Sequence, residues 1–360
     1  MARIIIVIPD GRLNGVYVQA SVMRDWAVRS GAVEHASIVC LGSRPSIQNG
    51  SIPGVDLVEA TAVAMKTYLT ENSPSFVLLE SLFSLTLNSV PGWTAVLTEL
   101  GLPYVVRIHE MIPMEGAERM WTRAAPPPAT FFPNPAQRVA VVVPTQTALK
   151  HYDLLIHKHR NVAVIPIGID VDRVPEPLPP TTADILQIGT LYPRKGPLHT
   201  INAFAKISSR YPQSSLCFVG PLTAHVEVAV SACKLHGIYN RVQFVGSQED
   251  AFGYYQSAAL STLHSESEST PTVAIESMLS GRPFTGSAVG GTTELLAGTS
   301  CERYLFEYGD TNGHARAMET ILSDPYRAYM QTLADRSVLA GRHDIAVVGP
   351  RMIALGQSLV

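Results

Sequence analysis

Short apolar runs recur along the chain and alternate with longer amphipathic stretches. The first run, residues 4–8 (IIIVI), is continuous and β-branched, which is typical of a parallel strand covered on both faces. A glycine-bearing loop at 9–15 and a predicted helix from Val16 to about Arg29 follow it. Further runs predict strands at 37–41, 76–79, 104–107, 139–143 and 162–165. This alternation predicts an α/β fold with an open parallel sheet and crossover helices.

The pattern is interrupted at residues 166–180, where prolines are dense enough to indicate a linker. A second series then predicts strands at 185–189, 216–220, 242–246 and 260–264. Helices are predicted at 197–207, 224–236, 250–257 and 271–280. Two α/β domains of similar size, joined by a linker, predict a cleft in which ligands bind at the carboxyl ends of the strands.

Composition narrows the class of protein. The 360 residues are 46% hydrophobic and 16% charged, which favours two folded cores over disorder. A net charge of −3 argues against non-specific nucleic-acid binding, which requires a basic surface. The four cysteines match no zinc pattern, and with no secretory signal or membrane-span run they favour a cytoplasmic protein. A mean hydropathy of +0.15 leaves peripheral contact with the inner face of the membrane open.

The segment 268–276 (ESTPTVAIE) carries two carboxylates, Glu268 before a predicted helix and Glu276 within it. Thr270 is a candidate N-cap, and Pro271 suits the first helical position. The amides of Thr272 and Val273 would then be unpaired at the positive end of the helix dipole, which suits a diphosphate. The alternative, a solvated loop residue and a helix-face charge, is the commoner explanation for such a pair in isolation.

The pair is not isolated, because the helix continues through Gly281-Arg-Pro283 to a strand at 284–286 and then to Gly290-Gly291-Thr-Thr-Glu294. This block resembles the donor-binding region of the retaining GT-B glycosyltransferases (glycosyl transferases group 1), which include bacterial lipopolysaccharide and exopolysaccharide glycosyltransferases and sucrose-phosphate synthases. The resemblance implies two Rossmann-like domains facing a cleft, an acceptor-side domain at 1–168 and a nucleotide-sugar domain at 169–339. A C-terminal helix at about 340–360 is a candidate to pack back on the first domain.

The resemblance also implies roles for single residues of this block. Glu268 would contact hydroxyls of the transferred sugar, and amides near Ser269 and Thr270 would help to hold that sugar. Glu276 would bind the ribose hydroxyls. The residues that would donate to the diphosphate are Thr272 and Val273.

Two adjacent cations, Arg194 and Lys195, precede Gly196 after the first strand of the second series. Two solvated loop charges are the simpler explanation, but the motif matches the family's phosphate-binding Arg-Lys-Gly, and such cations suit a pyrophosphate leaving group. Many family members carry Arg where this chain has Thr190. Gly246 and Ser247 end a strand where the family contacts the nucleobase; an ordinary turn is the alternative.

The first half contributes Gly15, whose amide the resemblance places near the diphosphate, although Asn14 departs from the usual glycine pair. His109 follows a strand at the position where the family has a histidine beside the donor sugar. Residues 166–170 (PIGID) resemble the family's linker, with Ile167 in place of Asn. Asp170-Val-Asp172 also spells the metal motif D-x-D, an interpretation we reject because it lies in the hinge.

A histidine-rich stretch, His151, His157 and His159 with Lys158 and Arg160, admits a metal site or a solvated basic face. We favour the basic face, which an anionic acceptor or a lipid head group can use.

The function that the resemblance implies is transfer of a hexose from a nucleoside diphosphate sugar, with UDP favoured, to an acceptor hydroxyl in bacterial glycan biosynthesis. The reaction would retain configuration and need neither metal nor cofactor. A glycan, a lipid-linked or a small-molecule acceptor would bind the first domain, including residues 111–135. The alternatives are a GT-B epimerase, a glycosyl phosphorylase, and a non-catalytic nucleotide-sugar-binding protein, which the departures at Asn14, Thr190 and Ile167 keep open.

Overall fold

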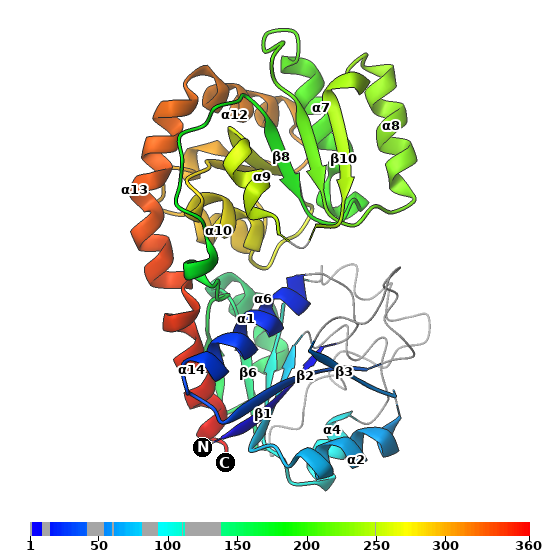
Figure 1. The fold of residues 1–360 in the computed structure, drawn as a ribbon, viewed down its shortest axis with the longest axis vertical. Helices are drawn as coiled ribbons and strands as arrows, with labels where there is room; N and C mark the ends of the chain where they lie inside the picture. Colours follow the sequence, from blue (N-terminus) through cyan, green and yellow to red (C-terminus); the bar gives the residue numbers. More distant parts are fainter. Residues whose placement is uncertain are drawn as a thin grey trace. The chain divides into compact units, whose positions relative to one another are not determined.

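The computed structural model describes residues 2–8, 15–41, 54–59, 61–80, 93–109, 111, 138–248 and 250–360. The chain divides into two compact units, Met1–Asp170 with His343–Val360, and Val171–Arg342. Each unit is an α/β fold built on a parallel sheet, as the alternation of apolar runs predicts (Figure 1). The predicted loop at 9–14 and the predicted acceptor segment at 112–135 lie outside the described residues.

The sheet of the first unit has the order β3-β2-β1-β4-β5-β6-β7 among the described residues, and all of its pairs are parallel. The strands are β1 (Arg3–Ile8), β2 (His35–Leu41), β3 (Val55–Val58), β4 (Phe76–Glu80), β5 (Tyr104–Arg107), β6 (Val139–Val143) and β7 (Val162–Val164). The helices are α1 (Gly15–Arg29), α2 (Ala62–Asn72), α4 (Trp93–Glu99), α6 (Gln146–Ile156) and α14 (Ile345–Gln357).

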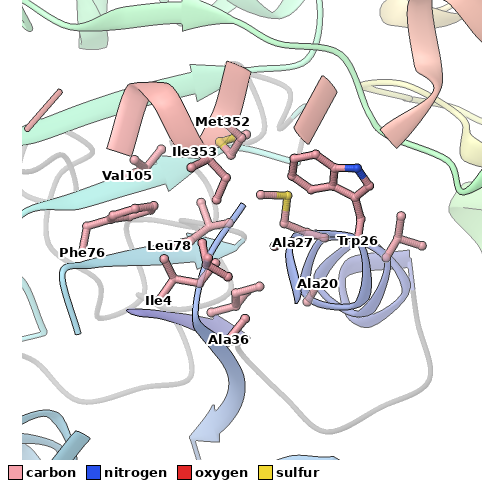
Figure 2. Packing of buried hydrophobic residues seen from close by; sticks show 14 of the residues in the cluster. Ile4, Ala20, Trp26, Ala27, Ala36, Phe76, Leu78, Val105, Met352 and Ile353 are labelled. Carbon is pink, nitrogen blue, oxygen red and sulfur yellow. The ribbon is translucent and has the colours of Figure 1, made fainter. Parts of the chain in front are cut away.

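Both faces of this sheet are covered, which explains the continuous apolar run of β1. Ile4 and the alternate residues of β1 belong to a core cluster with Trp26 of α1 and Met352 of α14 (Figure 2). The intervening residues, such as Ile5, belong to a second cluster on the other face with α2, α4 and α6. A glycine lets α14 approach α1 closely: a Cβ on Gly349 would lie 2.3 Å from the Trp26 ring.

The second unit repeats the plan with the order β10-β9-β8-β11-β12-β13. Its strands are β8 (Ile185–Ile188), β9 (Leu216–Val219), β10 (Val242–Gly246), β11 (Leu260–Leu263), β12 (Phe284–Ser287) and β13 (Leu305–Phe306). Its helices are α7 (Pro197–Ile207), α8 (His225–Leu235), α9 (Phe252–Ser257), α10 (Thr272–Leu279), α11 (Gly291–Leu296), α12 (Thr311–Ser323) and most of α13 (Pro325–His343).

The strand order reverses at the same place in both units, between the first and the fourth strand of each series. The reversal lies between β1 and β4 in the first unit and between β8 and β11 in the second. Loops that leave the carboxyl ends of two such strands turn to opposite faces of the sheet, so a crevice opens between them, and ligands of open α/β sheets bind there.

The predicted cap of α10 is wrong by one residue. The cap is Pro271, with φ −72° and ψ 103°, and the helix begins at Thr272. Thr270 does not cap it, because its hydroxyl donates to the Ser269 carbonyl at 2.8 Å. The prolyl ring fixes φ for residue 271 but allows an extended ψ, which leaves the proline just outside the helix.

Candidate active site

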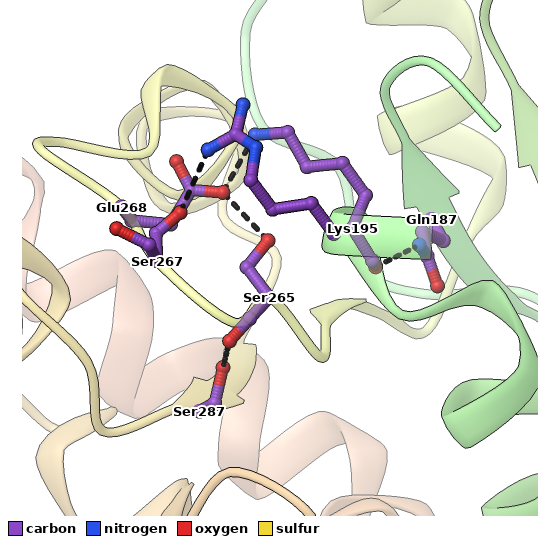
Figure 3. A network of polar contacts seen from close by, with 7 residues as sticks. Gln187, Lys195, Ser265, Ser267, Glu268 and Ser287 are labelled. Carbon is purple, nitrogen blue, oxygen red and sulfur yellow. Dashed lines mark hydrogen bonds and ion pairs between the residues drawn. The ribbon is translucent and has the colours of Figure 1, made fainter. Parts of the chain in front are cut away.

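The loops that follow β8 and β11 meet at the strand-order reversal of the second unit. Lys195, after β8, donates from Nζ to Oε1 of Glu268, after β11, at 2.6 Å (Figure 3). The Glu268 side chain is 8% exposed and that of Lys195 23%. The structure therefore brings together two residues that lie 73 positions apart in the sequence.

One oxygen of the Glu268 carboxylate, Oε1, accepts two hydrogen bonds, of which the bond from Lys195 is the first. Ser265 Oγ also donates to Oε1, at 2.6 Å. A carboxylate has about four acceptor positions, so Oε2 can still accept hydrogen bonds from hydroxyl groups. Lys195 likewise has three donors and spends one on Glu268. The pair is thus partly satisfied, and both members can still bind a ligand.

Hydrogen bonds to backbone carbonyls hold the two loops together. The Glu266 amide donates to the Arg194 carbonyl at 2.9 Å, and Arg194 Nη1 donates to the Ser267 carbonyl at 3.0 Å. Gly196 has a φ of +61°, and a Cβ there would lie 2.0 Å from the His264 carbonyl oxygen. Only glycine fits both the left-handed backbone and this close approach.

The paired glycines of the sequence motif hold the other side of the Glu268 loop. The Gly291 amide donates to the Glu268 carbonyl at 2.9 Å, and Gly290, with φ +50° and ψ −130°, turns the chain into α11. At the start of the same loop, the Ser287 hydroxyl donates to the Ser265 carbonyl (Figure 3). Glu268 is therefore fixed from β12 and α11 as well as from Lys195.

The N-terminus of α10 carries polar groups that no side chain caps. The first amide with an intrahelical partner is that of Ala274, which donates to the Pro271 carbonyl at 3.0 Å. The amides of Thr272 and Val273 precede it, at the positive end of the helix dipole. The Ser269 hydroxyl is buried and has no hydrogen-bond partner. These groups suit an anion that also offers acceptor oxygens.

Glu276 is half-buried one turn into α10 and faces α9. Tyr255 OH lies 3.0 Å from Oε2 of Glu276 and 3.2 Å from the Val273 carbonyl. Burial raises the pKa of Glu276 from 4.5 to about 7, although the tyrosine hydrogen bond opposes the rise. The buried Arg282 supports Tyr255 in turn, because its Nε donates to the Tyr255 carbonyl at 2.8 Å. A carboxylate of this kind gains from a ligand that supplies further donors, as a ribose diol does.

Gly246 and Ser247 lie farther along the same sheet edge, at the end of β10. Gly246 has a φ of +85°, and its carbonyl accepts from the amide of Gly220, at the end of β9, at 2.9 Å. Ser247 is exposed. Since β9 and β8 separate β10 from β11, these residues stand apart from the Glu268 loop.

Two neutral histidines, His264 and His314, form a chain of hydrogen bonds beneath the Glu268 loop. The Gly309 amide donates to His264 Nε2 at 2.9 Å, so His264 carries its proton on Nδ1. That proton points to His314 Nδ1 at 3.0 Å, and His314 Nε2 then donates to Thr262 Oγ1 at 2.6 Å. Burial, and then the neighbouring His199, lower the pKa of His264 to about 4. This cluster was not predicted from the sequence, because its members are far apart in the chain.

The first unit positions His109 beyond the end of β5. His109 Nε2 forms a short hydrogen bond with Oε2 of Glu80, which ends β4 and is fully buried. Arg107 Nη1 lies 3.6 Å from Oε1 of the same carboxylate. Glu80 was not predicted from the sequence; the signal for it was a carboxylate at the end of an otherwise apolar strand. Gly15 is the exposed first residue of α1, next to Asn14, which lies outside the described residues.

The D-x-D segment is divided between different environments. Asp170 is buried and pairs with Arg29 Nη2 at 3.0 Å, whereas Asp172 is exposed in a short 3₁₀ helix. Within the described ranges, no group of three or more His, Cys, Asp or Glu side chains is arranged to hold a metal ion. No helix in the described part of the chain has the length and apolarity needed to cross a membrane.

The second unit is similar to a known family of proteins. Residues 182–324 match the model of the glycosyl transferases group 1. The match covers most of the second unit, and the chain has the GT-B fold. The matched region contains Arg194, Lys195, Glu268 and Glu276, so the site described above lies within the family domain.

Curated relatives match parts of the chain. N-acetyl-alpha-D-glucosaminyl L-malate synthase of Bacillus anthracis is 34% identical over 124 residues, 34% of this chain and 32% of that enzyme. D-inositol 3-phosphate glycosyltransferase 2 of Catenulispora acidiphila is 27% identical over 187 residues, 46% of this chain and 44% of that enzyme. The matches thus span less than half of the length of these relatives.

Solved structures match along the whole chain. HepE of Anabaena, in complex with UDP-glucose, superimposes with a TM-score of 0.77 and 16% identity, covering 100% of both chains. Sucrose-phosphate synthase of Thermosynechococcus elongatus gives 0.76 and 18% identity, covering 100% of this chain and 99% of that one. At these identities the likeness establishes the fold.

Proposed function

We propose that the protein is a retaining, metal-independent glycosyltransferase that moves a hexose from a UDP-sugar to an acceptor hydroxyl. The observation that carries the proposal is the Lys195–Glu268 pair at 2.6 Å, held at the strand-order reversal beside the uncapped N-terminus of α10. It combines an acceptor for sugar hydroxyls with donors for a diphosphate in one small region.

The donor would bind with its diphosphate against the amides of Thr272 and Val273. Oε2 of Glu268 would accept hydrogen bonds from hydroxyls of the sugar, and Glu276 would accept hydrogen bonds from those of the ribose. The relatives support a nucleotide-sugar donor: HepE was solved with UDP-glucose. We keep Gly246 and Ser247 as candidate contacts of the base, and Gly15 as a further diphosphate contact.

Charge stabilisation is the main chemical task, because negative charge grows on the diphosphate as the bond to the sugar breaks. Arg194, Lys195 and the two helix amides supply donors for that charge, the part that a metal ion plays elsewhere. The acceptor oxygen forms its bond to the anomeric carbon on the face from which the diphosphate leaves. The acceptor proton passes to the departing phosphate oxygen, so protons and charge balance without a protein base.

His109 is the residue to which we assign a hydrogen bond with a hydroxyl of the donor sugar. As a base it would instead activate the acceptor for inversion, the competing mechanism. We place the acceptor, a glycan, lipid-linked or small molecule, on the first unit. The basic residues around Lys158 are candidates for contact with an anionic acceptor or a membrane surface in bacterial glycan synthesis.

The test is turnover with a panel of labelled UDP-, GDP- and ADP-sugars, with and without EDTA, followed by proton NMR of the first-formed product. We expect transfer from a UDP-sugar, unchanged by EDTA, with a small anomeric coupling that reports an α-linkage. A large coupling from a gluco-configured sugar would refute retention. Rescue of EDTA-treated enzyme by Mg²⁺ or Mn²⁺ would refute metal independence. Phosphate uptake or release would identify a phosphorylase, and formation of an epimer of the donor sugar would identify an epimerase. Binding without turnover would identify a non-catalytic protein.

A further inference from the structure

Glu80 is a charged side chain with no access to solvent, and its position follows from strand register. β4 and β5 are parallel, and Glu80 pairs with Arg107 in the register of the sheet. Side chains at paired positions share a face, and residues two apart in an extended chain share one as well. Arg107, Glu80 and His109 therefore project from the same face at the carboxyl end of the sheet.

The Glu80 carboxylate is ionised despite its burial. Burial by itself raises the pKa of Glu80, but Arg107 and then His109 lower it, and the net result is a pKa below the ordinary value of 4.5. An ionised carboxylate only accepts hydrogen bonds. The ring nitrogen that faces it, His109 Nε2, must therefore carry a proton.

A role for Glu80 as the counterion of Arg107 does not by itself explain this arrangement. Arg107 Nη1 and Glu80 Oε1 are 3.6 Å apart, beyond hydrogen-bond distance, whereas Arg107 Nη2 donates to the Pro166 carbonyl at 3.2 Å. Glu80 Oε1 has no hydrogen-bond partner. The hydrogen bond that the carboxylate does form goes to His109. The geometry indicates that Glu80 orients the His109 imidazole and is more than a counterion of Arg107.

We propose that Glu80 is a positioning residue for His109: it fixes the ring with Nε2–H toward the carboxylate and leaves Nδ1 as the nitrogen that meets a ligand. The inference rests on the proposed function insofar as that ligand is the donor sugar. With the Nε2 proton directed to Glu80, an unprotonated Nδ1 of His109 accepts a hydrogen bond from a sugar hydroxyl, and a ring whose rotamer is fixed in advance loses less entropy on binding.

The direct test is the tautomer of His109 in the free protein, measured by NMR with ¹⁵N-labelled histidine and assigned by comparison with His109→Gln. At pH 8 we expect a proton on Nε2 and none on Nδ1. In Glu80→Gln, the amide group that replaces one oxygen can face His109 and would then favour the Nδ1–H tautomer. A wild-type ring that is protonated on Nδ1, or that averages between tautomers, would overturn the proposal whether or not the protein transfers sugar.

Kinetics give a second, independent readout. We expect Glu80→Gln to lower kcat by about 10- to 100-fold, the scale seen when the partner that orients a functional histidine is removed. The donor KM should stay within about threefold, because the Glu268 and Glu276 contacts remain. Glu99→Gln, which removes an exposed carboxylate paired with Lys66 in the same unit, is the matched control and should leave kcat unchanged.

Different experimental results distinguish a failure of this inference from a failure of the proposed function. A Glu80→Gln protein with a lower Tm but wild-type kcat would mean that Glu80 is structural only. If Glu80→Gln does not fold, the wild-type tautomer decides the question. If the wild type shows the Nε2–H tautomer but transfers no sugar, the proposed function fails and the positioning role stands.

Discussion

Glu276 connects the stability of the second unit to its proposed ligand through pH. Its pKa rises from 4.5 to about 7 because the carboxylate is buried against α9. The folded state therefore holds a proton between these pH values that the unfolded state has lost. Stability falls as pH rises through this window, and the full penalty is present above pH 7. At about 1.36 kcal/mol per pH unit, the penalty is at most ~3 kcal/mol.

The perturbation is Glu276→Gln, which keeps an acceptor for Tyr255 and removes the charge. We expect the variant to gain roughly 1–3 kcal/mol over the wild type at pH 8 and little at pH 5, measured by urea unfolding. The difference between the two proteins is the quantity to follow, because His264 titrates in the opposite sense. Glu227→Gln, at an exposed site on α8, is the control. Parallel pH profiles for Glu276→Gln and the wild type would refute the reasoning.

The same group should make donor binding depend on pH. Two ribose hydroxyls are best accepted by the ionised carboxylate, so the Kd of a UDP-sugar should increase as pH falls from 7 to 5, by up to about tenfold per pH unit. A UDP-sugar is the right ligand because its diphosphate diester has no ionisation in this range. Calorimetry in two buffers would detect the released proton. A pH-independent Kd, or a Glu276→Gln variant with wild-type affinity at pH 8, would remove Glu276 from the ligand site.

Three further predictions concern the loops and the layer beneath them. Lys195→Ala and Arg194→Ala should each lower turnover by roughly a hundredfold. Only Lys195→Ala should also lower Tm, because it leaves the buried Glu268 carboxylate without its cationic partner. Wild-type rates in both variants would mean that the two charges are merely solvated. Gly196→Ala should destabilise the protein by several kcal/mol, on the order of 3. Gly237 also has a positive φ, +67°, but nothing lies within 4 Å of an added Cβ, so Gly237→Ala should destabilise the protein by only about 1 kcal/mol. Equal losses would show that the contact of an added Cβ at Gly196 with the His264 carbonyl is harmless. The depressed pKa of His264, from 6.5 to about 4, should remove up to ~3 kcal/mol of stability as pH falls through that window, and a His264→Gln variant with the same acid sensitivity would contradict this.

Most of the architecture could be predicted from local sequence. Continuous β-branched runs such as residues 4–8 identify strands that are buried on both faces, and β1 lies where its run predicts. The two carboxylates at 268–276 were recognisable as a site because the segments that follow them, Gly281-Arg-Pro283 and Gly290-Gly291, complete a block that resembles a known family. β3 was missed, because Val55–Val58 is short and its two central residues are exposed. The cap of α10 was misplaced because the ψ of a proline cannot be inferred from its ring.

What the sequence by itself determined is the approximate position of most helices and strands and, with it, several of the polar residues that stand at the ends of strands. Hydrophobic periodicity and turn chemistry act over a few residues, so they are visible in one dimension. Only the tertiary structure decided the partners: Lys195 with Glu268, His264 with His314, and Glu80 with His109. Strand order and register bring these pairs together across 73, 50 and 29 positions, and burial then lowers the pKa values of His264 and His314. Both depend on packing between distant segments, which no local pattern encodes.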